Sequence, residues 1–149
     1  MSKKALGIAV ALLVSLPWMA SAGSFEGSAE GQVTGQTPVP TGVQLDVEAS
    51  GTATRLGSFT RTETLVLDPV TNTFSGGVTF TDEAGDTLVG TVAGAFVSAG
   101  AATGTYEWTS GTGRFEHPVG SARFVVNTLD GVHLKVEFKG TLSLIRPAS

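Results

Sequence analysis

The sequence contains no cysteine and only two histidines, His117 and His133, in 149 residues. The missing cysteines exclude disulfides, thiolate nucleophiles and thiolate metal sites, so the hydrophobic core alone must hold the fold. Two histidines disfavour a multi-histidine metal centre, and no Gly-x-Ser-x-Gly elbow marks a serine hydrolase. We therefore predict neither a metal site nor a cofactor.

Long hydrophobic runs are also missing, except for Ala5–Leu16 near the N-terminus. Two lysines precede this run, and Ala20-Ser21-Ala22 follows it with the small-x-small pattern of a signal-peptidase site. A transmembrane anchor is the alternative, but the run is shorter than the roughly 20 residues that a span needs. We predict a signal peptide over residues 1–22, cleaved after Ala22, and a secreted or periplasmic protein without a membrane span.

Basic residues are few, because nine Lys and Arg stand against thirteen Asp and Glu, giving a net charge of −4. Cleavage after Ala22 removes two lysines and leaves seven basic residues against the same thirteen acidic ones. Nucleic acids and anionic membrane surfaces are bound through clustered Lys and Arg. The composition therefore excludes both as partners.

Helical periodicity is absent as well, whereas apolar and polar residues alternate throughout residues 23–149. The clearest alternation is Val132–Leu144, where every even-numbered residue is apolar or glycine. Ser121–Leu129 precedes it, and the connecting Asp130-Gly131 is typical of a two-residue type I′ turn. We expect a hairpin here, with the even-numbered positions of its second strand facing the core.

Six further segments have strand-like patterns: 25–34, 43–50, 54–67, 73–81, 87–98 and 103–109. Pro38 and Pro40 predict a loop over Gln36–Gly42, and Gly76-Gly77 predicts a bulge. About eight strands without an intervening helix indicate an antiparallel sandwich or barrel. Glycines inside the strands favour the barrel, because a closed sheet must bend sharply. The prediction is an all-β, antiparallel eight-stranded barrel that forms one domain over residues 23–149.

Four residues are candidates for ligand binding. Arg61 and Glu63 share a strand face with apolar residues. If that face points inward, an ion pair lies in an apolar lumen, where its desolvation is costly and often functional; in the reverse register both are ordinary surface charges. Tyr106 and Trp108 also share a face, and they either line a ligand pocket or pack in the core. No catalytic residue can be assigned.

The segments Gly51–Thr60, Phe80–Leu88 and Gly104–Phe115 together resemble bacterial secreted proteins of the allene oxide cyclase-like barrel group. Plant dirigent proteins share the Gly-Thr-Gly-Arg-Phe element that ends at Phe115. The resemblance spans most of residues 23–149 and implies an eight-stranded barrel whose interior holds an apolar small molecule, and a homo-oligomer. The residues after Phe115 depart from the small residues of that group, and no catalytic residue of the plant enzymes matches a motif here.

Three functions fit these observations. The first is a non-catalytic module that binds a small apolar ligand or a protein partner. The second is an isomerase or cyclase that acts on an apolar substrate in the barrel lumen, and the third is a structural envelope protein with a solid core. The lack of a clear polar cluster favours the first and third over an enzyme, and the barrel interior distinguishes them.

Overall fold

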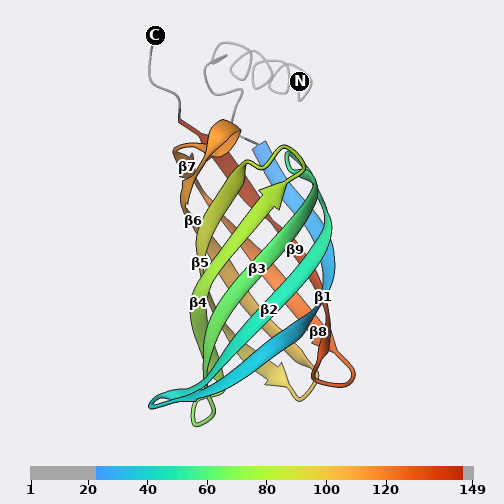
Figure 1. The fold of residues 1–149 in the computed structure, drawn as a ribbon, viewed down its shortest axis with the longest axis vertical. Helices are drawn as coiled ribbons and strands as arrows, with labels where there is room; N and C mark the ends of the chain where they lie inside the picture. Colours follow the sequence, from blue (N-terminus) through green and yellow to red (C-terminus); the bar gives the residue numbers. More distant parts are fainter. Residues whose placement is uncertain (1–22, 146–149) are drawn as a thin grey trace, which may run out of the picture.

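The computed structural model describes residues 23–145, and the predicted signal peptide lies outside this part of the chain. The described residues form the strands β1 (Gly23–Val39), β2 (Gly42–Ala53), β3 (Gly57–Asp68), β4 (Thr73–Asp82), β5 (Thr87–Ser98), β6 (Ala101–Gly111), β7 (Pro118–Val119), β8 (Ser121–Thr128) and β9 (His133–Leu144), with the short 3-10 helix η2 (Gly113–Phe115) between β6 and β7 (Figure 1). Within these residues, none of the helices has the length and apolarity that crossing a bilayer requires.

The strands form a closed antiparallel barrel. Apart from the short β7, strands that follow one another in the chain are neighbours in the sheet, and β1 closes the wall by pairing with β9 from Gly23 to Gln32. Eight long strands make the wall, while β7 adds only a two-residue pairing with β9. The predicted all-β, eight-stranded barrel is confirmed. The turns after β1, β3, β5 and β8 gather at one end, which we call the lower end as it is drawn in Figure 1.

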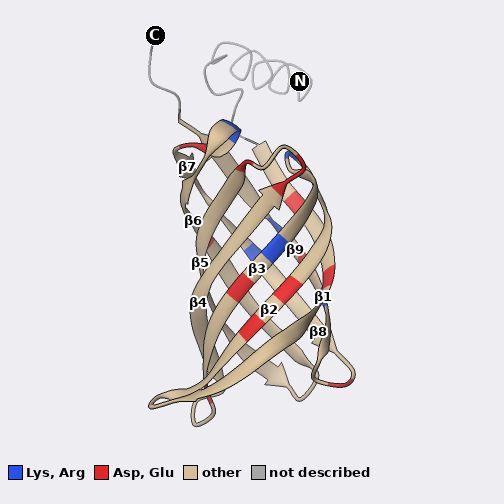
Figure 2. Ribbon diagram, viewed as in Figure 1, with Lys and Arg blue, Asp and Glu red and all other residues tan. Residues whose placement is uncertain are grey.

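Alternation decides which residues face the lumen. In β9, Leu142 and Leu144 are buried and Thr141 is exposed, as the apolar pattern predicts. Val132 is the exception, because it precedes the strand and is exposed. Among the described charged residues only Arg61, Glu63 and Asp82 are buried, and Figure 2 shows where the charged residues lie along the strands and turns. The inner face is thus apolar almost throughout, which makes its few charged members informative.

The turn between β8 and β9 differs from the predicted type I′ turn. Gly131 has a φ of 78°, but Asp130 has no positive φ, and a type I′ turn needs both. The Asp130 carboxylate instead accepts hydrogen bonds from the amides of Val132 and His133, at 2.8 and 2.7 Å. The hairpin prediction is therefore confirmed, while the predicted turn type is wrong.

Two predicted segment boundaries are also wrong. Gln36–Gly42 is mostly strand, because β1 runs to Val39 and pairs Pro38 with Val43. Beyond Gln32, β1 pairs with β2 alone, so the proline ring, which lacks an N–H, sits on a free strand edge where it breaks no ladder. The segment 54–67 is interrupted, because Thr54–Leu56 forms the turn between β2 and β3.

The predicted bulge at Gly76-Gly77 is wrong too, because β4 pairs with both β3 and β5 at these residues without a register shift. The two glycines have different surroundings. A Cβ on Gly76 would lie 1.9 Å from the backbone oxygen of Thr64, whereas a Cβ on Gly77 would meet nothing nearer than 3.8 Å. Gly76 therefore permits the close approach of two backbones where the wall coils.

Candidate functional site

The upper half of the barrel is filled by aromatic side chains. Phe80 lies at the centre, with ring centroids 5.2 to 6.1 Å from its five aromatic neighbours. The cluster consists of Phe25, Phe59, Phe80, Tyr106, Trp108 and Phe138, all buried. Most pairs meet edge to face, the arrangement that aromatic quadrupoles favour. This half of the lumen is a packed core.

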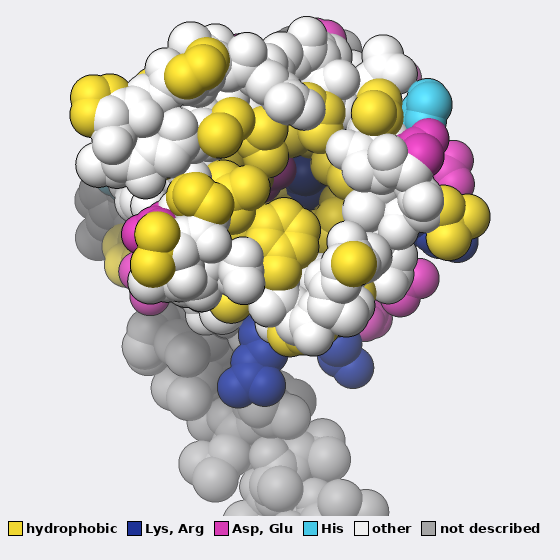
Figure 3. Space-filling model, turned by 90° about the horizontal axis from the view of Figure 1, so that it is seen from below, with side chains coloured by type: hydrophobic (Ala, Val, Ile, Leu, Met, Phe, Trp, Pro, Cys, Tyr) yellow, Lys and Arg dark blue, Asp and Glu magenta, His cyan; other side chains and the backbone are white. Residues whose placement is uncertain are grey.

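The lower half is hollow. A cavity of about 300 Å³ opens at the lower end, where Figure 3 shows a depression walled by hydrophobic side chains, with a basic and an acidic side chain at its depth. Its wall is made mainly by Val43, Leu45, Val47, Leu65, Leu67, Phe74, Phe96, Ala102, Phe124, Val126 and Leu134. Arg61 and Glu63 are the charged residues of the lining. The lumen is therefore neither solid nor free of charge.

Arg61 and Glu63 form the inner floor of this cavity. Both belong to β3, whose odd-numbered residues face the lumen, so the inward register of the two considered is the one observed. Arg61 is 2% exposed and Glu63 is 7% exposed. The Arg61 Nη2 atom donates to Glu63 Oε1 at 3.1 Å, and Nη1 donates to the Tyr106 hydroxyl at 2.6 Å. Tyr106 thus anchors the guanidinium from behind.

One donor of this floor is unused. The Nε atom of Arg61 is buried and has no hydrogen-bond partner within residues 23–145. A buried donor without a partner carries a desolvation cost of about 1–3 kcal/mol. The guanidinium also lies over the rings of Phe80 and Tyr106, at 6.0 and 5.8 Å from their centroids, which offsets part of that cost.

Burial sets the proton affinities at the floor. It raises the pKa of Glu63 above the usual range of a carboxyl group, although the neighbouring Arg61 guanidinium opposes this shift. Burial likewise raises the pKa of Tyr106, so its phenol stays protonated. The floor therefore offers one cationic donor and one carboxyl group that can gain or lose a proton.

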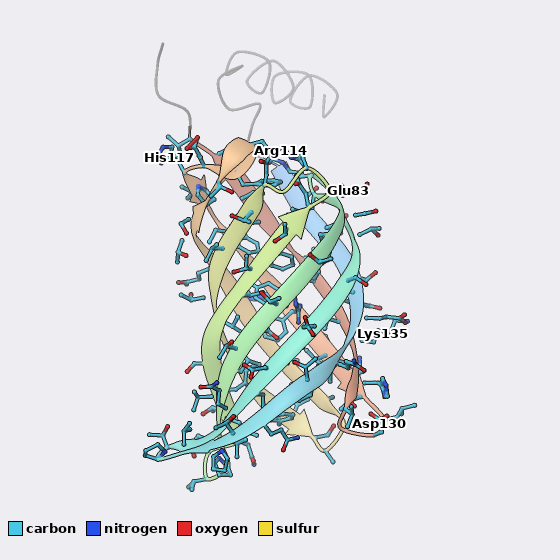
Figure 4. All side chains as sticks on the ribbon, viewed as in Figure 1. Glu83, Arg114, His117, Asp130 and Lys135 are labelled. Atoms are coloured by element: carbon cyan, nitrogen blue, oxygen red, sulfur yellow. The ribbon has the colours of Figure 1, made fainter. Side chains whose placement is uncertain are left out.

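The upper end is closed by the motif around η2. Phe115 is buried, and Arg114 donates from Nε to Asp82 Oδ2 at 2.9 Å and from Nη2 to the Leu56 carbonyl at 3.2 Å. Burial opposes ionisation of Asp82, but Arg114 and nearby backbone amides outweigh it and keep the pKa of Asp82 low. Figure 4 shows Arg114 at this end, far from Asp130 at the lower end. The Gly-Thr-Gly-Arg-Phe element is structural here.

The four candidate residues divide into two groups. Arg61, Glu63 and Tyr106 come together in one hydrogen-bonded set, with two of them on the cavity wall. Trp108 lies in the packed half, where its Nε1 donates to the Thr141 carbonyl at 2.9 Å. Trp108 thus belongs to the packed aromatic cluster and does not line the cavity in which we place the ligand.

Sequence reasoning missed the aromatic residues of the cavity wall, among them Phe74 and Phe124. Each pairs across the sheet with a glycine, Phe74 with Gly94 and Phe124 with Gly104. A Cβ on either glycine would lie within 2.6 Å of the facing ring, so each ring occupies the space that the glycine leaves. Glycines repeated opposite phenylalanines were the signal that identifies this wall.

No protein-family model and no curated protein sequence matches this chain. Solved structures do match it in fold. The pterocarpan synthase dirigent protein PsPTS1 superposes with a TM-score of 0.61 over 85% of this chain and 97% of its own, at 14% sequence identity. The pterocarpan synthase dirigent protein GePTS1 gives the same TM-score and identity, over 86% of this chain and 92% of its own. The barrel is therefore dirigent-like in fold.

Proposed function

We propose that this protein binds one small, largely apolar molecule in the lower half of its barrel and carries out no chemistry on it. The supporting observation is the 300 Å³ cavity, whose apolar wall ends on Arg61 and Glu63. Preformed apolar concavities with a few fixed polar groups are typical of small-molecule sites. A structural barrel with a solid core would not leave this space.

Binding would divide between the wall and the floor. Leucine, valine and phenylalanine side chains remove the apolar part of the ligand from water, which supplies most of the affinity. A polar group at the inner end of the ligand would meet Arg61 and Glu63. Tyr106 and Glu63 already hold the guanidinium in place, so little side-chain entropy is lost when a ligand arrives.

A second candidate function is an isomerase or cyclase, and one observation favours it. Glu63 is a buried carboxyl group with a raised pKa on the wall of an open cavity, beside a fixed cation. A carboxyl group with a raised pKa is suited to donating or accepting a proton in a reaction. Glu63→Gln separates the two functions, because a binding module keeps its ligand unchanged with either residue, whereas an enzyme converts its substrate only with Glu63.

The proposal also covers the cellular location and the oligomeric state of the protein. A signal peptide over residues 1–22 would export the barrel to the periplasm or to the outside of the cell, and its predicted cleavage makes Gly23 the first residue of the exported protein. N-terminal sequencing of that protein tests this. The segment Gly111–Phe115 supports kinship with the secreted allene oxide cyclase-like group, whose members suggest a homo-oligomer; light scattering measures the assembly.

The direct test is a binding titration with N-phenyl-1-naphthylamine, a neutral apolar probe whose fluorescence rises in apolar surroundings. Ala102 is buried on the cavity wall, so Ala102→Leu fills part of the cavity. Ala93 is exposed on the outer face of β5, so Ala93→Leu is the matched control. We expect Ala102→Leu to weaken probe binding about tenfold or more and Ala93→Leu to leave it unchanged. Equal affinities for the two variants would refute the proposed site.

A further inference from the structure

Exposed hydrophobic side chains gather around the mouth of the cavity. Of the large hydrophobic residues exposed within residues 23–145, five lie at the lower end: Val70, Phe96, Val97, Leu129 and Val132. Val70 is 89% exposed at the β3–β4 turn, Val97 is 64% exposed at the end of β5, and Leu129 is fully exposed at the β8–β9 turn. Two turns and the end of β5 therefore each present an apolar side chain at the lower end, and Figure 3 shows hydrophobic side chains around the opening.

These turns satisfy their own backbone groups. Asp68 Oδ1 accepts from the amide of Val70 at 2.9 Å, and Asp130 Oδ1 accepts from the amide of Val132 at 2.8 Å. The amide of Gly131 donates to the Thr128 hydroxyl at 2.8 Å. An amide that already has a partner loses little when water is removed from it. The tip amides can therefore enter the headgroup layer without losing hydrogen bonds, while the Asp68 and Asp130 carboxylates that accept these bonds stay hydrated among the headgroups.

The turns around the cavity mouth, which we call the rim, carry a charge that limits the kinds of surface they can bind. None of the segments 38–42, 68–73, 97–101 and 128–133 contains Lys or Arg, and Figure 2 shows only acidic residues coloured at the lower turns. Anionic lipid surfaces attract basic residues and repel these turns. A protein partner would be expected to hydrogen-bond to exposed turn amides, but several of these are already engaged. An electrically neutral lipid surface fits both observations.

We infer that the lower end docks on an electrically neutral lipid surface, with Val70, Val97 and Leu129 inserted among the lipid headgroups and the cavity mouth facing the membrane. Apolar side chains that enter the membrane interface lower the free energy of binding in proportion to the apolar area that they bury. The cavity mouth then faces the lipid bilayer, in which apolar molecules concentrate. The uptake of a ligand from lipid rests on the proposed function, but the docking itself does not.

Flotation of the purified protein with phosphatidylcholine vesicles tests this inference. The variant Val70→Asp/Leu129→Asp places charges on two tips, and the control Val119→Asp/Ile145→Asp places the same charges on exposed apolar residues at the upper end. We expect the wild type and the control to float with the vesicles and the tip variant to lose about tenfold or more of its partitioning. Adding anionic phosphatidylglycerol to the vesicles should weaken flotation.

Several results would overturn the inference. They are a wild type that stays with the soluble fraction, equal losses in the two double variants, or stronger flotation with anionic vesicles. A dimer that forms without lipid and dissociates in the tip variant would assign the rim to a second copy instead. Ala102→Leu keeps the docking separate from the proposed function, because it blocks the cavity and leaves the tips intact, so it should float like the wild type.

Discussion

Arg61 on β3 donates a 2.6 Å hydrogen bond to the hydroxyl of Tyr106 on β6, 45 residues away in the sequence. This bond marks the boundary between the two halves of the lumen. On one side Tyr106 contacts Phe80, Trp108 and Phe138 of the packed core, and on the other side Arg61 and Glu63 face the cavity. The cavity floor is thus held by the core behind it.

Removal of the cation should destabilise the barrel strongly. In Arg61→Met, Glu63 loses its buried partner, so we expect the free energy of unfolding to fall by about 3–5 kcal/mol. Arg123→Met removes an exposed arginine from the outer face of β8 and should change stability by less than about 0.5 kcal/mol. Urea unfolding measures both.

The double variant Arg61→Met/Glu63→Leu completes this test. It replaces the ion pair by apolar groups, so it should regain at least half of the stability that Arg61→Met loses. If the double variant is as unstable as Arg61→Met alone, the loss comes from packing and not from the unpaired carboxylate.

Glu63 should also give the stability a distinct pH dependence. Because its pKa is raised in the folded protein, the folded state binds the proton more tightly than the unfolded state does. The free energy of unfolding should therefore fall as pH rises from the ordinary pKa of 4.5 through the raised one. Asp82, whose pKa is lowered, acts in the opposite direction and only below its ordinary value of 3.8. Thermal unfolding of Glu63→Gln should lack the Glu63 slope, and an unchanged slope would contradict this assignment.

The adjacent glycines Gly76 and Gly77 should respond differently to the same substitution. Gly76→Ala forces a Cβ against the Thr64 carbonyl, so we expect a loss of about 1–3 kcal/mol. Gly77→Ala has open space and should be neutral or slightly stabilising. Chemical denaturation of the two variants compares them directly, and similar losses would show that the close approach at Gly76 does not determine the effect.

The sequence was sufficient to predict the architecture and part of the site. Alternation in Val132–Leu144 identifies the core-facing positions of β9 because apolar burial dominates that strand. The inward register of Arg61 and Glu63 could not be decided, because charged residues on an apolar face are compatible with either side. That ambiguity is settled by closure of the wall, a property of all eight strands together.

Other features depend on three-dimensional spacing that no local pattern contains. The pairing of Phe74 with Gly94 appears only once β4 and β5 are in register, and it places an aromatic ring on the cavity wall. The Asp130-Gly131 pair suggested a tight turn, yet the Asp130 carboxylate stabilises a wider one by binding two amides. Side chains that compete for backbone donors change turn geometry without changing the hairpin.

The central claim is that the lower half of the barrel is a ligand site with Arg61 and Glu63 as its floor. A crystal structure of the protein with N-phenyl-1-naphthylamine tests it most directly. We expect density for the probe between Leu65, Phe74 and Val126, with its amine toward Glu63. Density for the probe on the outer wall, or a cavity left without probe at saturating concentration, would contradict the account.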